Sequence, residues 1–293
     1  MLADGEGVFL TFLGLAGACI GSFMNVVVYR LPRECMFIAR PRSRCTACAT
    51  PIAWYDNIPI LSWLLLRARC RHCKTHISAR YVSVEIVVAA WFVLSAWHQL
   101  CADGADDILA ASGERWITWG VQALIFVCLL ALSLIDFDHR ILPDELTIGG
   151  MVLGPVLAFL APSFQHGRSF VKGVLGWDLA PNLLAVADGL LGMLAAAGVL
   201  WGVGWLGAKA FRREAMGFGD VKMFGAMGAV LGMWVFLALV VASLTGALIG
   251  VVSMCLGQGR QIPFGPFLAV GMLVVMFAGP WLLELWLGLA RAH

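Results

Sequence analysis

The chain has 293 residues, of which 61% are hydrophobic and 13% are charged, and its mean hydropathy is +0.87. These values exclude an ordinary soluble globular protein and are typical of a membrane protein with several spans. The net charge of +2 is small, and nothing in the composition indicates a nucleic-acid partner.

The apolar runs predict an all-α, polytopic membrane protein with about eight transmembrane helices. The stretch 222–256 is too long for one straight helix, so we divide it at Gly232-Met233-Trp234 and expect a short or tilted first half. The first run follows two acids and no base, which favours an uncleaved helix over a signal peptide. The expected spans are 8–29, 83–101, 116–136, 145–162, 183–208, 222–234, 235–256 and 266–289.

Basic residues gather on one side of these spans. The segment 30–82 holds ten of the 20 Lys and Arg residues, whereas 102–114 holds four acids and no base. Cytoplasmic connections of membrane proteins carry an excess of Lys and Arg. We therefore expect 30–82 in the cytoplasm, together with 137–144, 209–221 and 257–265.

Four of the nine cysteines form two pairs that are twenty-one residues apart. Four thiolates bind zinc tightly in tetrahedral geometry, and thiols on the reducing side of the membrane do not form disulfides. The spacing predicts a zinc-ribbon-like cytoplasmic loop, with iron and the ligands His72 and His76 as the alternatives. Four protein ligands leave no position for water, so the site is expected to be structural. The pairs are Cys45-x-x-Cys48 and Cys70-x-x-Cys73.

The segment 54–63 between the cysteine pairs is aromatic and contains turn-forming residues. We expect it to be the packed tip of the ribbon, with Trp54 and Trp63 near the depth of the lipid headgroups. Core packing within the ribbon is the simpler reading of the same residues.

Two acids lie at the ends of apolar runs. Asp136 follows the run 116–135, and Asp220 closes the sequence Gly217-Phe218-Gly219-Asp220 before another run. A carboxyl group at such a place needs a function, and two that meet can share a proton and activate a water. We therefore expect Asp136 and Asp220 to form a catalytic pair near one face of the membrane.

The other acids have simpler explanations. Asp138 lies in a polar connection and is expected to be solvated or paired. Asp144 or Glu145 is expected to cap the helix that follows Pro143, and Asp144 is the favoured one. Asp188 is expected to be a boundary or packing residue, and Glu85 to cap its helix or pair with a loop arginine.

Glycines recur at the spacing that brings membrane helices close together. The two pairs are Gly228-x-x-x-Gly232 and Gly246-x-x-x-Gly250. We expect both pairs to serve packing rather than chemistry.

Together these motifs resemble the bacterial type IV prepilin peptidases, also called prepilin leader peptidase/N-methyltransferases, which are membrane aspartyl proteases with a Gly-x-Gly-Asp motif. The chain departs from the family at Val82, where relatives often have Pro, and in the outer segment 163–182, which is longer than expected. The resemblance rests on Gly21 to Val26 with Arg30-Leu31-Pro32, the cysteine pairs around Trp54 to Trp63, Arg80-Tyr81 before Glu85, Asp136 with Leu142-Pro143-Asp144, Gly217 to Lys222, and Pro263 to Pro266.

The resemblance implies two activities at the cytoplasmic face of the bacterial inner membrane. The first is cleavage of the basic leader of type IV prepilins or type II secretion pseudopilins after its last glycine, by aspartates that match Asp136 and Asp220. The second is methylation of the new N-terminal amine from S-adenosylmethionine. The family's methylation is associated with the cytoplasmic loop and the first-helix motif, which makes Gly21, Asn25, Glu85 and the four paired cysteines candidates for a role in it.

The expected domains are a first transmembrane helix (1–29), a cytoplasmic zinc-binding loop (30–82) and a transmembrane aspartyl peptidase core (83–293), in contact with membrane lipid. The pattern indicates no oligomeric state. One alternative is a peptidase without methyltransferase activity. Another is a proton-coupled membrane carrier that uses the same carboxylates, but both acids lie at one face rather than the midplane and no inverted repeat is evident. A non-enzymatic scaffold would leave both acids unexplained.

Overall fold

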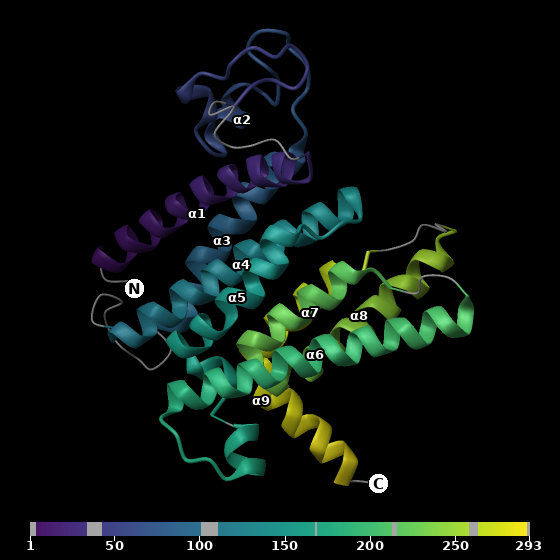
Figure 1. Cartoon of the computed structure of the whole chain (residues 1–293). Helices are drawn as coiled ribbons and strands as arrows, with labels where there is room; N and C mark the ends of the chain where they lie inside the picture. Colours follow the sequence, from purple (N-terminus) through teal and green to yellow (C-terminus); the bar gives the residue numbers. More distant parts are fainter. Residues whose placement is uncertain are drawn as a thin grey trace. The chain divides into compact units, whose positions relative to one another are not determined.

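The computed structural model describes residues 4–33, 43–100, 111–167, 169–212, 216–257 and 263–291. Within these ranges the chain is helical, and its only β-type pairings are two isolated bridges in the cysteine loop. This confirms the all-α prediction. The chain divides into two compact units, Met1–Val127 and Cys128–His293 (Figure 1).

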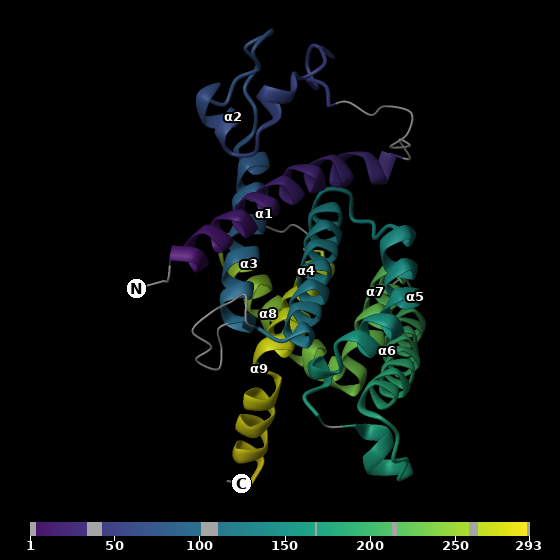
Figure 2. The ribbon, with the colours of Figure 1, turned by 90° about the vertical axis from the view of Figure 1, so that its left-hand side faces the viewer.

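The first unit is built on two long helices, α1 (Asp4–Arg30) and α3 (Ala79–Leu100), which pack against each other (Figure 1) and cross in the view of Figure 2. They approach closely because α1 presents glycine to α3. A Cβ atom added at Gly21 would lie 2.8 Å from the Cα atom of Glu85. Small residues allow such contacts between membrane helices, where the hydrophobic effect does not drive association.

The second unit is organised around α7, whose inward side chains are almost fully buried. α7 packs between α5 and α6 (Figure 1). Glycine again sets the distance, because an added Cβ at Gly154 or Gly228 would collide with the neighbouring helix. The helices of this unit are the end of α4 (Gly113–His139), α5 (Asp144–Leu160), α6 (Pro181–Phe211), α7 (Phe218–Leu231), α8 (Val235–Cys255) and α9 (Gly265–Arg291).

The predicted break at Gly232 is confirmed. α7 ends there, Gly232 has a φ of 59°, and the short 3-10 helix η7 (Gly232–Trp234) leads into α8. This conformation suits glycine, which lacks a Cβ atom. α7 has 14 residues, or about 21 Å, which is too short to cross a hydrocarbon core of about 30 Å.

The predicted count of eight transmembrane helices is not confirmed. Among the described residues, six ranges are long and apolar enough to cross a membrane. α5, with 17 residues, falls outside this set, and α7 and α8 form one continuous range. The six ranges are Glu6–Arg33, Ala79–Leu100, Gly113–His139, Pro181–Ala210, Phe218–Cys255 and Gly265–Leu285.

The two glycine pairs differ in how closely they pack against neighbouring helices. Gly228 packs against the backbone of Gly192 in α6, as expected of a close contact between helices. Gly246 packs against Phe267, but Gly250 has no neighbour within 4 Å of an added Cβ atom. The packing prediction is therefore confirmed for the first pair and for one half of the second.

Candidate active site and metal centre

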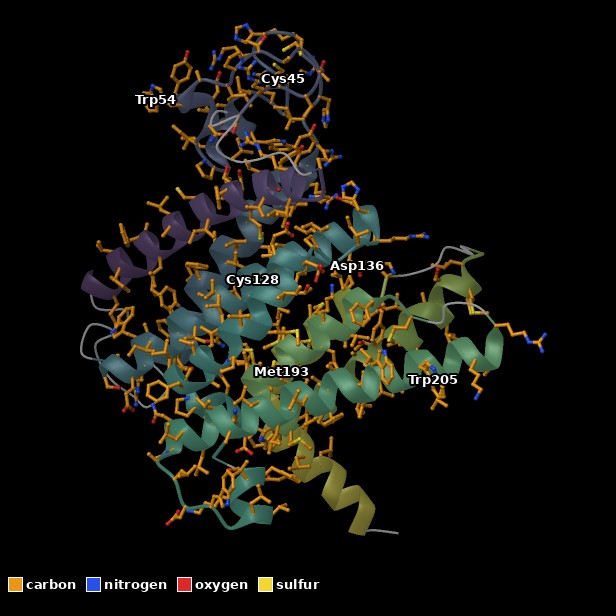
Figure 3. The ribbon with its side chains drawn as sticks, in the orientation of Figure 1. Cys45, Trp54, Cys128, Asp136, Met193 and Trp205 are labelled. Atoms are coloured by element: carbon orange, nitrogen blue, oxygen red, sulfur yellow. The ribbon has the colours of Figure 1, made fainter. Side chains whose placement is uncertain are left out.

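Asp136 lies near the end of α4 and is 7% exposed (Figure 3). The helix closes just after it, where Arg140 adopts a left-handed conformation and donates its backbone N–H to the Asp136 carbonyl (2.9 Å). The Oδ2 atom of Asp136 accepts a hydrogen bond from the backbone N–H of Gly265 (3.0 Å). Because Gly265 is the first residue of α9, the carboxyl group lies at a helix N-terminus, which attracts negative charge.

Asp220 lies in the first turn of α7, where its backbone N–H donates to the carbonyl of Gly217 (3.2 Å). Its side chain is partly buried. The two carboxyl groups predicted to form a pair therefore belong to the same unit and lie at the N-terminal ends of α9 and α7.

Leu142 joins the surroundings of the two acids. A Cβ atom added at Gly219 would lie 2.9 Å from Leu142 Cβ, and one added at Gly265 would lie 3.5 Å from Leu142 Cδ2 and 2.6 Å from Asp136 Oδ2. The starts of α7 and α9 and the connection after α4 thus meet so closely that a side chain at Gly219 or Gly265 would displace Leu142 or the Asp136 carboxyl group. Sequence reasoning used Gly265 and Leu142 as parts of motifs but assigned them no role in shaping the site.

The neighbouring acids take other partners. Asp144 does not cap α5, so that prediction is wrong: it is the first helical residue, and its Oδ1 accepts a hydrogen bond from Lys222 Nζ (2.6 Å). This ion pair links the starts of α5 and α7. Asp138 is exposed. Asp188 is 2% exposed and accepts a hydrogen bond from the backbone of Val171, which confirms a packing contact.

The four paired cysteines come together in the loop of the first unit (Figure 3, where Cys45 is labelled). Their four sulfur atoms all lie within 4.8 Å of one another, and those of Cys45 and Cys73 are 3.8 Å apart. Tetrahedral zinc with bonds of about 2.3 Å places its sulfur ligands about 3.8 Å apart. The donor set therefore fits a zinc ion, while His72 and His76 are exposed and lie outside this group.

The two cysteine pairs are copies of one local structure. In each, the N–H of the first cysteine donates to the carbonyl of a threonine, Thr50 (3.0 Å) or Thr75 (2.9 Å). The residue before each threonine has a positive φ. Each threonine Oγ1 also lies 3.3 Å from the second sulfur of its pair.

These threonines prepare the thiols to bind a metal. The hydrogen bond with Thr75 lowers the pKa of Cys73 to about 6, and the bond with Thr50 lowers the pKa of Cys48. A thiolate is the form that binds metal. Sequence reasoning missed both threonines, although their signal is present as a repeated Cys-x-x-Cys-x-Thr.

Three of the candidates for a role in methylation lie together where α1 meets α3. Glu85 Oε2 accepts a hydrogen bond from the backbone N–H of Ile60 (2.7 Å), and Gly21 packs against the Glu85 backbone. Asn25 Nδ2 donates to the carbonyl of Tyr81 (3.0 Å). Ile60 has a φ of 62°, which is rare for a β-branched residue. Glu85 thus ties the cysteine loop to α3 through this backbone amide.

The two tryptophans at the tip of the loop differ in their exposure to solvent. Trp54 is 80% exposed (Figure 3), whereas Trp63 is partly buried and donates its Nε1–H to the carbonyl of Ile77 (3.2 Å). Packing within the ribbon therefore explains Trp63. Arg71 donates two hydrogen bonds to Asp56 (2.7 and 2.6 Å), holds the pKa of that carboxyl below its usual range, and joins the tip to the second cysteine pair.

Two family models match the chain. The bacterial peptidase A24 N-terminal domain matches residues 15–99, which include the cysteine loop. The type IV leader peptidase family matches residues 123–251, which include Asp136 and Asp220. No solved structure matches.

Curated relatives cover most of the chain. A prepilin leader peptidase/N-methyltransferase of Myxococcus xanthus is 40% identical over 259 residues, which are 87% of this chain and 66% of that protein. Proteins of the same name from Pseudomonas putida and Dichelobacter nodosus are 34% and 33% identical; the matches cover 97% and 92% of this chain and 93% and 92% of those proteins. With its motifs, its membrane helices and these matches, the chain belongs to the type IV leader peptidase family.

Proposed function

We propose that this multi-pass inner-membrane enzyme removes the leader peptide of type IV prepilins or type II secretion pseudopilins with the carboxyl groups of Asp136 and Asp220. It then methylates the new N-terminus with S-adenosylmethionine. The observation that carries the assignment of the two acids is their position at two helix starts in one unit: Gly265, which donates to Asp136, and Gly219, the neighbour of Asp220, both lie against Leu142. The family membership and the names of the relatives support the two reactions.

The two carboxyl groups divide acid and base between them, because two close carboxyl groups do not both ionise easily. We assign the base to Asp136, since the Gly265 N–H donates to its Oδ2, and such a hydrogen bond favours the ionised carboxylate. Asp136 takes a proton from the water that attacks the glycyl carbonyl. Asp220, protonated, donates to the oxygen on which negative charge develops.

The reaction is assigned to the cytoplasmic face. Support comes from the ten basic residues of 30–82, which follow the rule for cytoplasmic loops. A substrate with a basic leader in the cytoplasm and an apolar segment in the membrane would bring its scissile bond to the boundary where Asp136 and Asp220 lie. In this scheme the first helix (1–29) is the anchor, the segment 30–82 is the metal-stabilised loop, and the segment 83–293 is the peptidase core.

Zinc has a structural role in this proposal. Cys45, Cys48, Cys70 and Cys73 would hold it, and a bound ion would fix the fold of the loop without entering the reaction. The hydrogen bond between Ile60 and Glu85 would then hold the folded loop against α3, next to Gly21. This makes the junction of α1, α3 and the loop our candidate for the methyl-donor site.

A direct test uses detergent-purified protein and a prepilin with a Gly-Phe junction, with and without S-adenosylmethionine, and reads both products by intact mass. We expect loss of the leader in both samples and a methyl increment only with the donor. Leader loss alone in both samples would leave a peptidase without methyltransferase activity. An uncut substrate, under conditions where a relative cuts it, would overturn the proposal and return attention to a carrier, which the family membership does not favour.

A further inference from the structure

The second unit contains a cavity at the end of α7 that is remote from Asp220. Its volume is about 520 Å³, and Leu231, the last residue of α7, lines it. Asp220 and Leu231 are eleven residues apart along α7, or about 16 Å. The cavity is therefore separate from the catalytic pair, and the proposed peptidase mechanism does not use it.

A buried acid, Asp188, lines this cavity. Asp188 is 2% exposed, and its Oδ1 accepts the backbone N–H of Val171 (2.9 Å). Its Oδ2 is buried and has no hydrogen-bond partner among the described residues. Burial of a carboxylate oxygen without a donor is unfavourable, so the site is incomplete as it stands.

Two polar residues that line the cavity, Gln165 and Trp234, donate their side-chain N–H groups elsewhere. Gln165 donates its amide to the carbonyls of Ala185 (2.8 Å) and Val230 (3.2 Å). Trp234 donates its indole N–H to the carbonyl of Gln165 (2.9 Å). These contacts leave Asp188 Oδ2 without a donor, and a molecule that enters the cavity could supply one.

The remaining wall is apolar and leads outward. Phe236, Leu237 and Val240 of α8 line it, and Val240 is 51% exposed. The mouth thus opens on the surface of a membrane helix. Asp188 is the eighth residue of the 31-residue helix α6, about 10 Å from the start of that helix, so in a helix that spans the membrane it would lie nearer to one membrane surface than to the midplane.

We propose that this cavity binds phosphatidylethanolamine from the surrounding membrane. Its primary ammonium group would donate to Asp188 Oδ2 and neutralise the carboxylate, because a buried charge is stable only when it is paired and hydrogen-bonded. Its hydrocarbon would lie along the wall formed by Phe236, Leu237 and Val240. Phosphatidylcholine has no N–H donor and cannot complete the site.

The test measures thermal unfolding of the purified full chain in detergent, with equal amounts of phosphatidylethanolamine, phosphatidylcholine or phosphatidylglycerol, or with free ethanolamine. The central variant is Asp188→Asn, which keeps an acceptor for Val171 and replaces Oδ2 by a donor. The matched control is Asp178→Asn, an exposed acid of the same outer segment that pairs with Lys172. A second control, Arg168→Gln, removes a base that lies outside the described residues.

We expect phosphatidylethanolamine to raise the melting temperature of the wild type and both controls by several degrees more than phosphatidylcholine does, and Asp188→Asn to lose this difference. Equal effects of the two lipids on the wild type, or a difference that persists in Asp188→Asn, would overturn the proposal. If Arg168→Gln also lost the difference between the two lipids, the result would indicate that Arg168 is the partner of Asp188, and it would overturn the proposal. An effect of free ethanolamine equal to that of the lipid would overturn the lipid as the source.

Native mass spectrometry of the wild type gives a second measurement that does not depend on the folding of any variant. Protein from micelles with equal phosphatidylethanolamine and phosphatidylcholine should retain the former preferentially, and equal retention would contradict the proposal. Neither measurement reads prepilin cleavage, so failure here is distinguishable from failure of the peptidase assignment.

Discussion

Replacing Asp136 by Asn separates the two tasks that the structure gives this carboxyl group. Asparagine keeps an oxygen that can accept the Gly265 N–H, but it cannot take a proton from water. A positioned acid or base contributes about 10²- to 10⁴-fold to a rate, so we expect at least this loss in kcat of prepilin cleavage. In the variant a neutral amide replaces the carboxylate as the acceptor of the Gly265 N–H. Hydrogen bonds to charged groups contribute about 1 kcal/mol more than neutral ones, so we expect Asp136→Asn to lose about this much folding stability.

Asp136→Ala provides the contrast. It leaves the Gly265 N–H without an acceptor, which costs about 1–3 kcal/mol, and it should therefore melt below Asp136→Asn while being equally inactive. The measurements are leader cleavage by intact mass and thermal unfolding in the same detergent, with the exposed Asp138→Asn as the matched control. Cleavage by Asp136→Asn at a tenth of the wild-type rate would show that Asp136 serves only to hold α9.

Three further predictions concern positions around the two sites. Gly265→Ala should reduce cleavage strongly, because its Cβ would lie 2.6 Å from Asp136 Oδ2, while Gly250→Ala, with open space around it, should cleave normally; equal activities would refute this account. Cys73→Ser should bind less zinc by metal analysis and unfold the loop, so an unchanged zinc content would exclude the four-cysteine site. Asp56→Asn should release zinc to a chelator faster at pH 7. Because the folded-state pKa of Asp56 is depressed, its stabilisation is present above the unfolded pKa of about 3.9 and is lost as the pH falls through the folded value; a rate difference that grows on acidification would contradict this.

The predictable features of this protein are those that depend on local pattern. Long apolar runs have one stable form in a bilayer, since each backbone polar group must find a partner within its own segment, and this is why the helices were found. Gly232 could be identified as a break because a run too long for one span contained a glycine at a suitable place. The cluster of four cysteines could be predicted because the spacing Cys-x-x-Cys itself nearly defines the local structure of each pair.

The roles of individual polar side chains were harder to predict from the sequence. Asp144 was expected to cap a helix from its neighbours in sequence, but its partner Lys222 lies 78 residues away. Glu85 was assigned to a cap or an arginine, and its observed partner is a backbone amide of the loop. Such contacts depend on which helices pack together, and this packing cannot be read from the order of the helices along the chain.

The sequence by itself determined the class of this protein: a membrane protein of apolar helices, with four clustered thiols and two acids at the ends of spans. These properties follow from hydropathy and short-range spacing, which act within one or two turns of chain. Only the tertiary structure decided that Gly265 donates to Asp136, that Leu142 fills the space between the starts of α7 and α9, and that Asp188 lines a cavity and has an oxygen unsatisfied. The reason is that a carboxyl group takes its function from the donors and charges around it, and here those come from helices far apart in sequence.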